Sequence, residues 1–137
     1  MTADVGLDEA DYVVRGMLFG DIDNDGDTDV VLCQSNGPAV ILRNEIGHRA
    51  NWLGLQLTDR VGSPAIGARV TVAGEPGAQT REVTAGASYL AGNDTRLLFG
   101  LGSGADAEVT VRWPDGQTTM RHIHKNLYTR WQRPEAR

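Results

Sequence analysis

The sequence is poor in cysteine and in long apolar runs, and each scarcity excludes a structural feature. Cys33 is the one cysteine among 137 residues, so an internal disulfide is impossible. It ends the run Asp29-Val-Val-Leu-Cys33, which predicts a buried small hydrophobe rather than a catalytic thiol. No segment approaches the roughly 20 apolar residues that a membrane-spanning helix needs. We therefore expect no membrane insertion.

The N-terminal residues also lack a targeting pattern. Met1 to Glu9 have neither a basic start nor an apolar centre, so the chain is expected to carry no secretory signal peptide. Asn93-Asp-Thr fits the N-glycosylation pattern, which matters only in a eukaryotic secretory setting. Twelve arginines against one lysine give no reason to assume that setting. The cellular compartment does not follow from these features.

Helical periodicity is missing as well. No run of ten or more residues repeats its apolar positions at helical spacing, and 17 glycines punctuate runs rich in Val, Thr, Leu and Ile. This pattern predicts many short strands joined by tight turns. The fold class is expected to be all-β, and the length suits one compact unit.

Residues 12–44 predict a strand, an acidic loop, a turn and two further strands. The strands are expected at 12–19, 28–34 and 39–43, with the loop at 21–29. Together they have about the length of one β-propeller blade, and the chain holds a single copy. One blade leaves strand edges exposed. We therefore expect it to pack onto the following residues or to pair with a second copy, giving a homo-oligomer.

Residues 51–132 predict a second domain, an antiparallel β-sandwich or barrel. Trp113-Pro-Asp-Gly has type I turn chemistry and places a hairpin at 108–123, with Val109, Val111 and Trp113 on its buried face. The expected strands are 52–58, 68–72, 80–85, 96–99, 108–113, 118–123 and 128–132.

Charge is unevenly distributed along the chain. Residues 1–29 hold nine acidic residues and one basic residue, Arg15, whereas the whole chain has a formal charge of -5. Such a density of carboxylates repels itself unless a cation neutralises it, and it disfavours nucleic acid as a partner. The C-terminal basic residues are spread along predicted strands and indicate a solvated face: Arg112, Arg121, Lys125, Arg130, Arg133 and Arg137.

The acidic loop has the spacing of a calcium-binding loop. It reads Asp21-x-Asp23-x-Asp25-Gly-x-x-Asp29, with carboxylates at loop positions 1, 3, 5 and 9 and glycine at 6. Calcium takes about six to eight oxygen ligands, which such a wrapping loop can supply. We predict Ca²⁺ as the cofactor. The predicted ligands are Asp21, Asp23, Asp25 and Asp29 together with the carbonyl of Asp27.

Three other interpretations of the loop are weaker. An EF-hand needs glutamate at position 12 and flanking helices, but Leu32 stands there and strands flank the loop. A solvated acidic turn has no need of five mutually repelling aspartates. Magnesium prefers a rigid octahedron that keeps several waters. Calcium as a structural clamp is therefore the preferred interpretation.

Two known families resemble this chain. Leu18-Phe-Gly-Asp-Ile-Asp-Asn-Asp-Gly-Asp-Thr-Asp-Val-Val-Leu resembles the FG-GAP, or VCBS, calcium-binding repeat. Downstream, Asn51-Trp-Leu, Ile66-Gly-Ala-Arg-Val-Thr-Val, Gly86-Ala-Ser-Tyr-Leu, Phe99-Gly-Leu-Gly and Val111-Arg-Trp-Pro-Asp-Gly resemble the ASPIC/UnbV domain. The order of the two is typical of the cartilage-acidic-protein-like and UnbV-like family. The resemblance implies an extracellular or periplasmic calcium-binding protein, and it brings no catalytic residues.

Other side chains offer weaker candidates. His122 and His124 could ligate a metal with His48, although paired surface histidines are commoner. Trp52, Trp113 and Trp131 could bind a glycan ring but are expected in the core. Ser88-Tyr89 could supply a nucleophile, but it lacks the usual elbow pattern, and a tight turn is the better account.

The sequence thus favours a non-enzymatic calcium-binding β module that contacts a protein or a glycan. One alternative is a structural fragment of a larger propeller protein without activity of its own. A less favoured alternative is a hydrolase that calcium supports. No residue is predicted to act in catalysis.

Overall fold

The fold is all-β, as the sequence predicts. The structure, a computed structural model, describes residues 13–74, 77–86 and 88–135. Within these ranges ten strands form three sheets, and the one helical turn is a 3-10 helix, η2 (Gly47–Arg49). None of the helical structure in the described ranges has the length and apolarity to cross a membrane.

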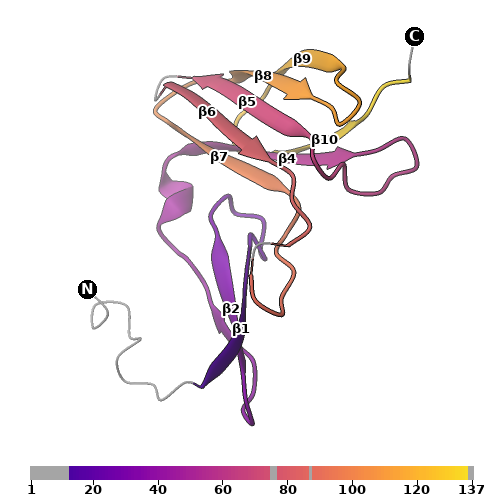
Figure 1. Ribbon diagram of the computed structural model, residues 1–137. Helices are drawn as coiled ribbons and strands as arrows, with labels where there is room; N and C mark the ends of the chain where they lie inside the picture. Colours follow the sequence, from indigo (N-terminus) through magenta and orange to yellow (C-terminus); the bar gives the residue numbers. More distant parts are fainter. Residues whose placement is uncertain (1–12, 75–76, 87, 136–137) are drawn as a thin grey trace.

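The first sheet is a three-stranded antiparallel unit that projects from the other two (Figure 1). It holds β1 (Val14–Gly20), β2 (Asp29–Gln34) and β3 (Val40–Leu42), in that spatial order. Leu18, Val31 and Ile41 lie opposite one another across the sheet, and Met17, Leu32 and Val40 form the next row. Successive rows face opposite sides of a sheet, so both faces of this unit are apolar.

Cys33 is exposed, which corrects the prediction that it is buried. It lies in β2 opposite Gly16 of β1, but β3 pairs only with Val30–Leu32 of β2. The short third strand therefore ends before it can cover Cys33. The predicted start of the first strand at Tyr12 lies outside the described residues.

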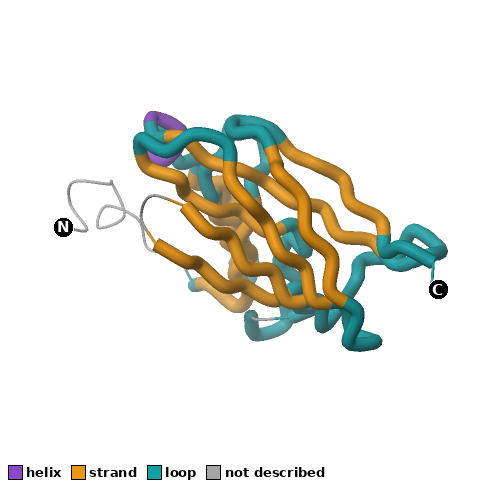
Figure 2. Tube along the Cα trace, turned by 90° about the horizontal axis from the view of Figure 1, so that it is seen from above, coloured by secondary structure: helices purple, strands orange, loops and turns teal. Residues whose placement is uncertain are grey.

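The remaining strands form a two-layer sandwich (Figures 1 and 2). One layer has the order β10-β4-β7, and the other has the order β6-β5-β8-β9. The first layer comprises β10 (Tyr128–Gln132), β4 (Asn51–Thr58) and β7 (Leu97–Gly102). The second comprises β6 (Gly77–Glu82), β5 (Arg69–Gly74), β8 (Ala107–Arg112) and β9 (Thr118–Ile123). The described strands form open sheets rather than a closed barrel.

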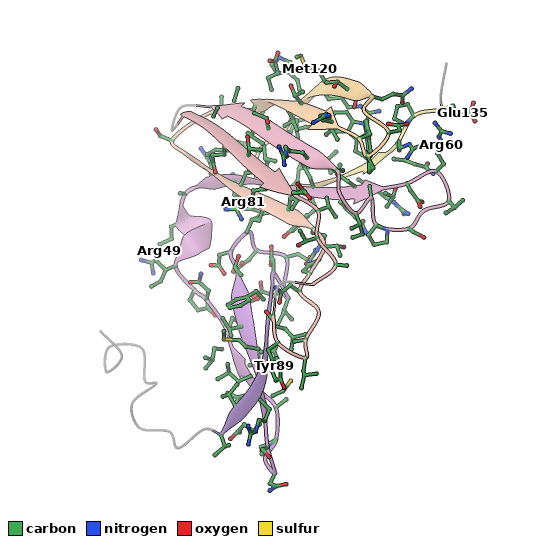
Figure 3. All side chains as sticks on the ribbon, in the orientation of Figure 1. Arg49, Arg60, Arg81, Tyr89, Met120 and Glu135 are labelled. Carbon is green, nitrogen blue, oxygen red and sulfur yellow. The ribbon has the colours of Figure 1, made fainter. Side chains whose placement is uncertain are left out.

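Two details of the sandwich differ from the prediction. Strand β10 runs parallel to β4, because the chain crosses from β9 in the opposite layer before it enters this sheet. Strand β6 occupies Gly77–Glu82 instead of 80–85, since Gly77 pairs with Gly74 of β5 and fixes the register there. Most side chains of β6 are exposed, including that of Arg81 (Figure 3), so its sequence gives little hydrophobic alternation to locate it.

The core lies between the two layers. Leu53, Leu55 and Leu57 of β4 are buried, and Val109 and Val111 of β8 are buried as well. Trp113 and Trp131 meet edge to face with ring centroids 6.2 Å apart. Gly116 donates its N–H to the carbonyl of Trp113 at 2.9 Å, which closes the predicted turn of the 108–123 hairpin.

The outer face of the β10-β4-β7 layer is also covered where β4 begins. Trp52 is 7% exposed although it alternates with the core residues Leu53 and Leu55. Gly54 lies opposite Tyr128 of the parallel strand, and a Cβ built on Gly54 would lie 2.3 Å from Cδ1 of Tyr128. The tyrosine ring therefore occupies the space that glycine leaves. This outer face supports the acidic loop.

Gly54→Ala is expected to lower the free energy of unfolding by roughly 1–3 kcal/mol, because the added methyl group forces the Tyr128 ring away from β4. Gly100→Ala is the matched control. Gly100 lies in the neighbouring strand β7, and a Cβ there meets nothing within 4 Å. Urea unfolding of both variants measures the difference. Equal stabilities would contradict the close packing of Tyr128 on Gly54.

Candidate metal centre

The acidic loop, Asp21 to Asp29, joins β1 to β2 at the end of the hairpin that faces the sandwich (Figure 1). Three of its five aspartates are almost fully buried: Asp21 and Asp27 are each 3% exposed, and Asp29 is 1% exposed. Asp23 is exposed and Asp25 is half-buried. Buried carboxylates are rare without hydrogen bonds, ion pairs or a metal.

Carboxylate oxygens converge at one point of this loop. Asp21, Asp23 and Asp29 each contribute one oxygen, and these three oxygens lie within 4.8 Å of one another. The structure thus brings together three of the five predicted metal-site residues, and this group does not include Asp25 or Asp27. Hard anionic oxygens of this kind suit a calcium or magnesium ion.

Backbone amides hold the carboxylates of Asp21 and Asp29 in place. Asp21 accepts the N–H of Asp25 on Oδ1 at 3.1 Å and that of Gly26 on Oδ2 at 2.9 Å. Asp29 accepts the N–H of Ile22 on Oδ2 at 2.8 Å and that of Asn44 on Oδ1 at 2.9 Å. Asp29 therefore ties the beginning of the loop to the segment after β3.

An arginine offsets part of the negative charge at the exposed side of the loop. The Nε of Arg43 lies 2.6 Å from Oδ2 of Asp23 and 2.7 Å from Oε1 of Glu45. The Arg43 side chain is 56% exposed, so this ion pair is screened by solvent. Its effect on the buried carboxylates is correspondingly weak.

The sandwich contacts the loop through an aromatic ring. A Cβ built on Gly26 would lie 1.9 Å from Cε2 of Trp52, so the indole ring rests directly on this glycine. The backbone of Gly26 also has φ +97°, a conformation that other residues rarely adopt. Glycine at position 26 is thus required for two reasons: its positive φ reverses the chain, and the Trp52 ring leaves no space for a Cβ.

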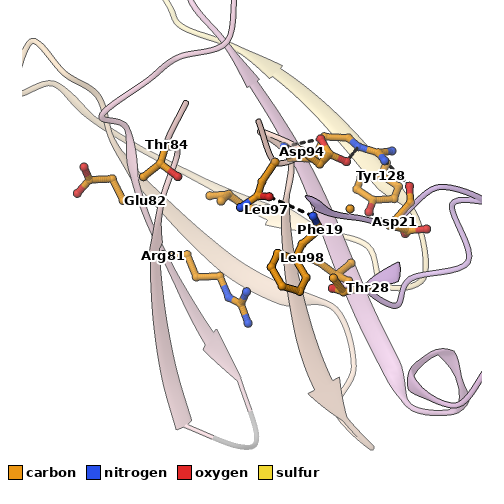
Figure 4. Close-up of a pocket in the computed structure, with 13 residues that line it drawn as sticks. Phe19, Asp21, Thr28, Arg81, Glu82, Thr84, Asp94, Leu97, Leu98 and Tyr128 are labelled. Carbon is orange, nitrogen blue, oxygen red and sulfur yellow. Dashed lines mark hydrogen bonds and ion pairs between the residues drawn. The ribbon is translucent and has the colours of Figure 1, made fainter. Parts of the chain in front are cut away.

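Two polar side chains of the sandwich also reach the loop, and Figure 4 shows that of Tyr128 beside Asp21. The hydroxyl of Tyr128 donates to Oδ2 of Asp21 at 2.7 Å. Burial, and then this hydrogen bond, raise the pKa of Tyr128 above its ordinary value, so the phenol stays protonated. Arg96 donates to the carbonyl of Asp21 and to Oδ1 of Asn24.

Sequence reasoning missed these contacts because they join distant positions. Tyr128 is 107 residues from Asp21, and Arg96 is 75 residues from it. Neither residue belongs to a local motif for metal binding. Their contacts with the loop follow only from the fold, which places the start of β10 and the residue before β7 beside the loop.

His122 and His124 are exposed and lie outside the acidic cluster. His122 pairs with Glu108 across β8 and β9. His124 follows the end of β9, and its Nδ1 lies 2.6 Å from Oδ2 of Asp106. The backbone N–H of Lys125, and then His124, lower the pKa of Asp106. Within the described ranges, the group of side chains placed to share a metal is the acidic cluster, and neither histidine belongs to it. The His48 side chain lies outside the described part of the chain.

The other weak candidates have structural partners. The hydroxyl of Ser88 lies 3.1 Å from Oδ1 of Asn93, which also accepts the N–H of Phe19 at 3.1 Å. Asn93 thereby attaches the segment between β6 and β7 to the outer edge of β1. The three tryptophans are 7% exposed or less, which confirms that they pack inside the molecule.

Comparison with protein families matches residues 59–136, more than half of the chain, to the family described as ASPIC and UnbV. The chain belongs to the ASPIC and UnbV family. The match covers the sandwich from the end of β4 onwards, including Arg96 and Tyr128. The acidic loop precedes the part of this ASPIC and UnbV protein that the family match covers.

Cartilage acidic protein 1 is a similar protein in several animals. The chain is 32% identical to the Homo sapiens protein over 112 residues, which are 79% of this chain and 17% of the human protein. It is 30% identical to the Xenopus tropicalis protein over 119 residues, which are 84% of this chain and 18% of that protein. The chain thus spans less than a fifth of the length of these relatives.

Gly26→Ala is expected to destabilise the protein by roughly 3–5 kcal/mol, because it combines a strained φ with overlap against the Trp52 ring. Gly116→Ala is the matched control. It also has a positive φ, +86°, but a Cβ there meets nothing within 4 Å, so it should cost only about 1–2 kcal/mol. Thermal unfolding compares the two. A similar cost at both positions would contradict the contact between Trp52 and the loop.

Proposed function

We propose that this protein is a non-enzymatic β module that Ca²⁺ stabilises by binding the acidic loop. The observation that carries the proposal is the convergence of the Asp21, Asp23 and Asp29 carboxylates, two of which are almost fully buried. Like charges at this spacing raise one another's energy, and a divalent cation at the same point removes that cost. Calcium binding would therefore contribute directly to folding stability.

The proposed ligands are the predicted ones. Asp21, Asp23, Asp25 and Asp29 would provide carboxylate oxygens, and Asp27 would provide its carbonyl. The spacing resembles the FG-GAP repeat, and the strand-loop-strand-turn-strand order of the hairpin sheet supports the same interpretation. Calcium tolerates the irregular, crowded oxygen set of such a loop better than magnesium, which requires a near-ideal octahedron.

We further propose an extracellular or periplasmic contact role. The relatives carry the name cartilage acidic protein, and this role extends that likeness to the present chain. The hairpin sheet supports it, since Ile41 is 62% exposed, Met17 40% and Phe19 37%. An exposed apolar surface of this kind suits a protein partner, a glycan or a second copy joined through a free strand edge.

Calcium added to chelator-treated protein is expected to raise the melting temperature. A ligand at about 100 times its Kd stabilises by about 2.7 kcal/mol, or roughly 10 °C for a domain of this size. Extracellular modules bind calcium at about 10⁻⁴ to 10⁻³ M, so 10–100 mM calcium tests the effect. Asp21→Asn and Asp29→Asn should each abolish the shift.

Asp59→Asn is the control for this experiment. Asp59 also caps an exposed turn, where its Oδ1 accepts the N–H groups of Val61 and Ser63 at 2.9 Å, but it lies outside the acidic cluster. This variant should keep the full shift, and magnesium should reproduce little of it. No shift in the wild type, or an equal loss in Asp59→Asn, would refute calcium binding by the loop.

A further inference from the structure

We propose that Tyr128 and Arg96 are positioning residues for the calcium loop, so that the ASPIC and UnbV sandwich completes a metal site whose ligands lie outside it. This inference rests on the proposed function, since it concerns the same loop. It assigns a role to two side chains of the sandwich that do not themselves ligate the ion.

Tyr128 fixes the carboxylate of Asp21. Its ring lies over Gly54 and is tilted against Trp52 with the centroids 5.3 Å apart, so the hydroxyl has little freedom. An ionised carboxylate offers about four lone-pair directions. In Asp21 three hydrogen bonds use these directions: one from Asp25 on Oδ1, and two from Gly26 and Tyr128 on Oδ2. The remaining direction, on Oδ1, is the one open to a cation.

Arg96 fixes the backbone on the other side of the same residue. Its Nη2 donates to the carbonyl of Asp21, and its Nη1 donates to Oδ1 of Asn24, which has a left-handed φ of 62°. Its Nε is held by Oδ2 of Asp94 at 2.6 Å, and its guanidinium lies 4.3 Å from the Tyr128 ring centroid. A planar fork with three such acceptors cannot be replaced by a lysine.

The two side chains therefore act together. Arg96 stacks on Tyr128, and both bond to Asp21, the first residue of the loop. Hydrogen bonds that orient metal ligands from outside the coordination shell commonly change metal affinity by about 10–100-fold. Because linkage is reciprocal, calcium bound in the loop would in turn strengthen the docking of the hairpin sheet on the sandwich.

The positive charge of Arg96 distinguishes a positioning role from a purely electrostatic effect on calcium affinity. A cation beside a cation site weakens binding by repulsion, so removing the arginine would strengthen calcium binding if charge were its only effect. Positioning predicts the opposite result. Arg96→Gln should weaken binding, and Arg96→Lys should also weaken it although the charge is kept.

Calcium affinity of the full chain, measured by isothermal titration calorimetry, tests this inference. Tyr128→Phe and Arg96→Gln are each expected to raise the Kd about 10-fold. Matched controls are Tyr89→Phe, at a tyrosine that is 78% exposed, and Arg121→Gln, at an arginine that stacks 4.5 Å from the Trp131 ring centroid on another part of the sandwich. Both controls should keep the wild-type Kd within about twofold.

A further variant tests the Arg96 contact in case the replacements of Tyr128 or Arg96 prevent folding. Asn24→Gly removes the Arg96 acceptor from an exposed loop position while it keeps a residue that accepts positive φ, and it should also weaken binding. Melting temperatures without calcium report any purely structural effect. If the wild type binds calcium and all these variants bind as tightly or more tightly, the positioning role is refuted while the proposed function stands. If the wild type itself binds no calcium, both proposals are refuted.

Discussion

The contact between the acidic loop and the outer face of the β10-β4-β7 layer is the constraint on which the arrangement of the molecule depends. Trp52 lies on Gly26, and the hydroxyl of Tyr128 bonds to a carboxylate that is 3% exposed. The hairpin sheet has few strands and apolar residues on both faces. Such a unit is marginal alone, so its docking on a well-packed sandwich supplies stability that it lacks.

The same contact explains why β4 is buried on both faces where it begins. Leu53, Leu55 and Leu57 point into the core, whereas Trp52 and Gly54 alternate with them and face the loop. Gly54 has no side chain, so the Tyr128 ring can lie over it and pack against the ring of Trp52. One face of β4 thus packs in the core, and the other contacts the acidic loop.

Much of the fold could be predicted from local patterns. The 108–123 hairpin and β10 appear where turn chemistry and alternation place them, since these signals arise within a few residues. The parallel pairing of β10 with β4 could not be predicted, because pairing partners far apart in sequence leave no local signal. The start of β6 was misplaced for a related reason, as its exposed side chains carry little alternation.

The sequence by itself determined the all-β class, the burial of the tryptophans and a loop of five aspartates with the spacing of a calcium site. These follow from periodicity, side-chain size and the regular placement of oxygen ligands along a few residues. The tertiary structure alone decided which carboxylates converge, that Cys33 is exposed, and that Arg96 and Tyr128 meet the loop. Each of these depends on packing between segments distant in the chain, which sequence spacing does not encode.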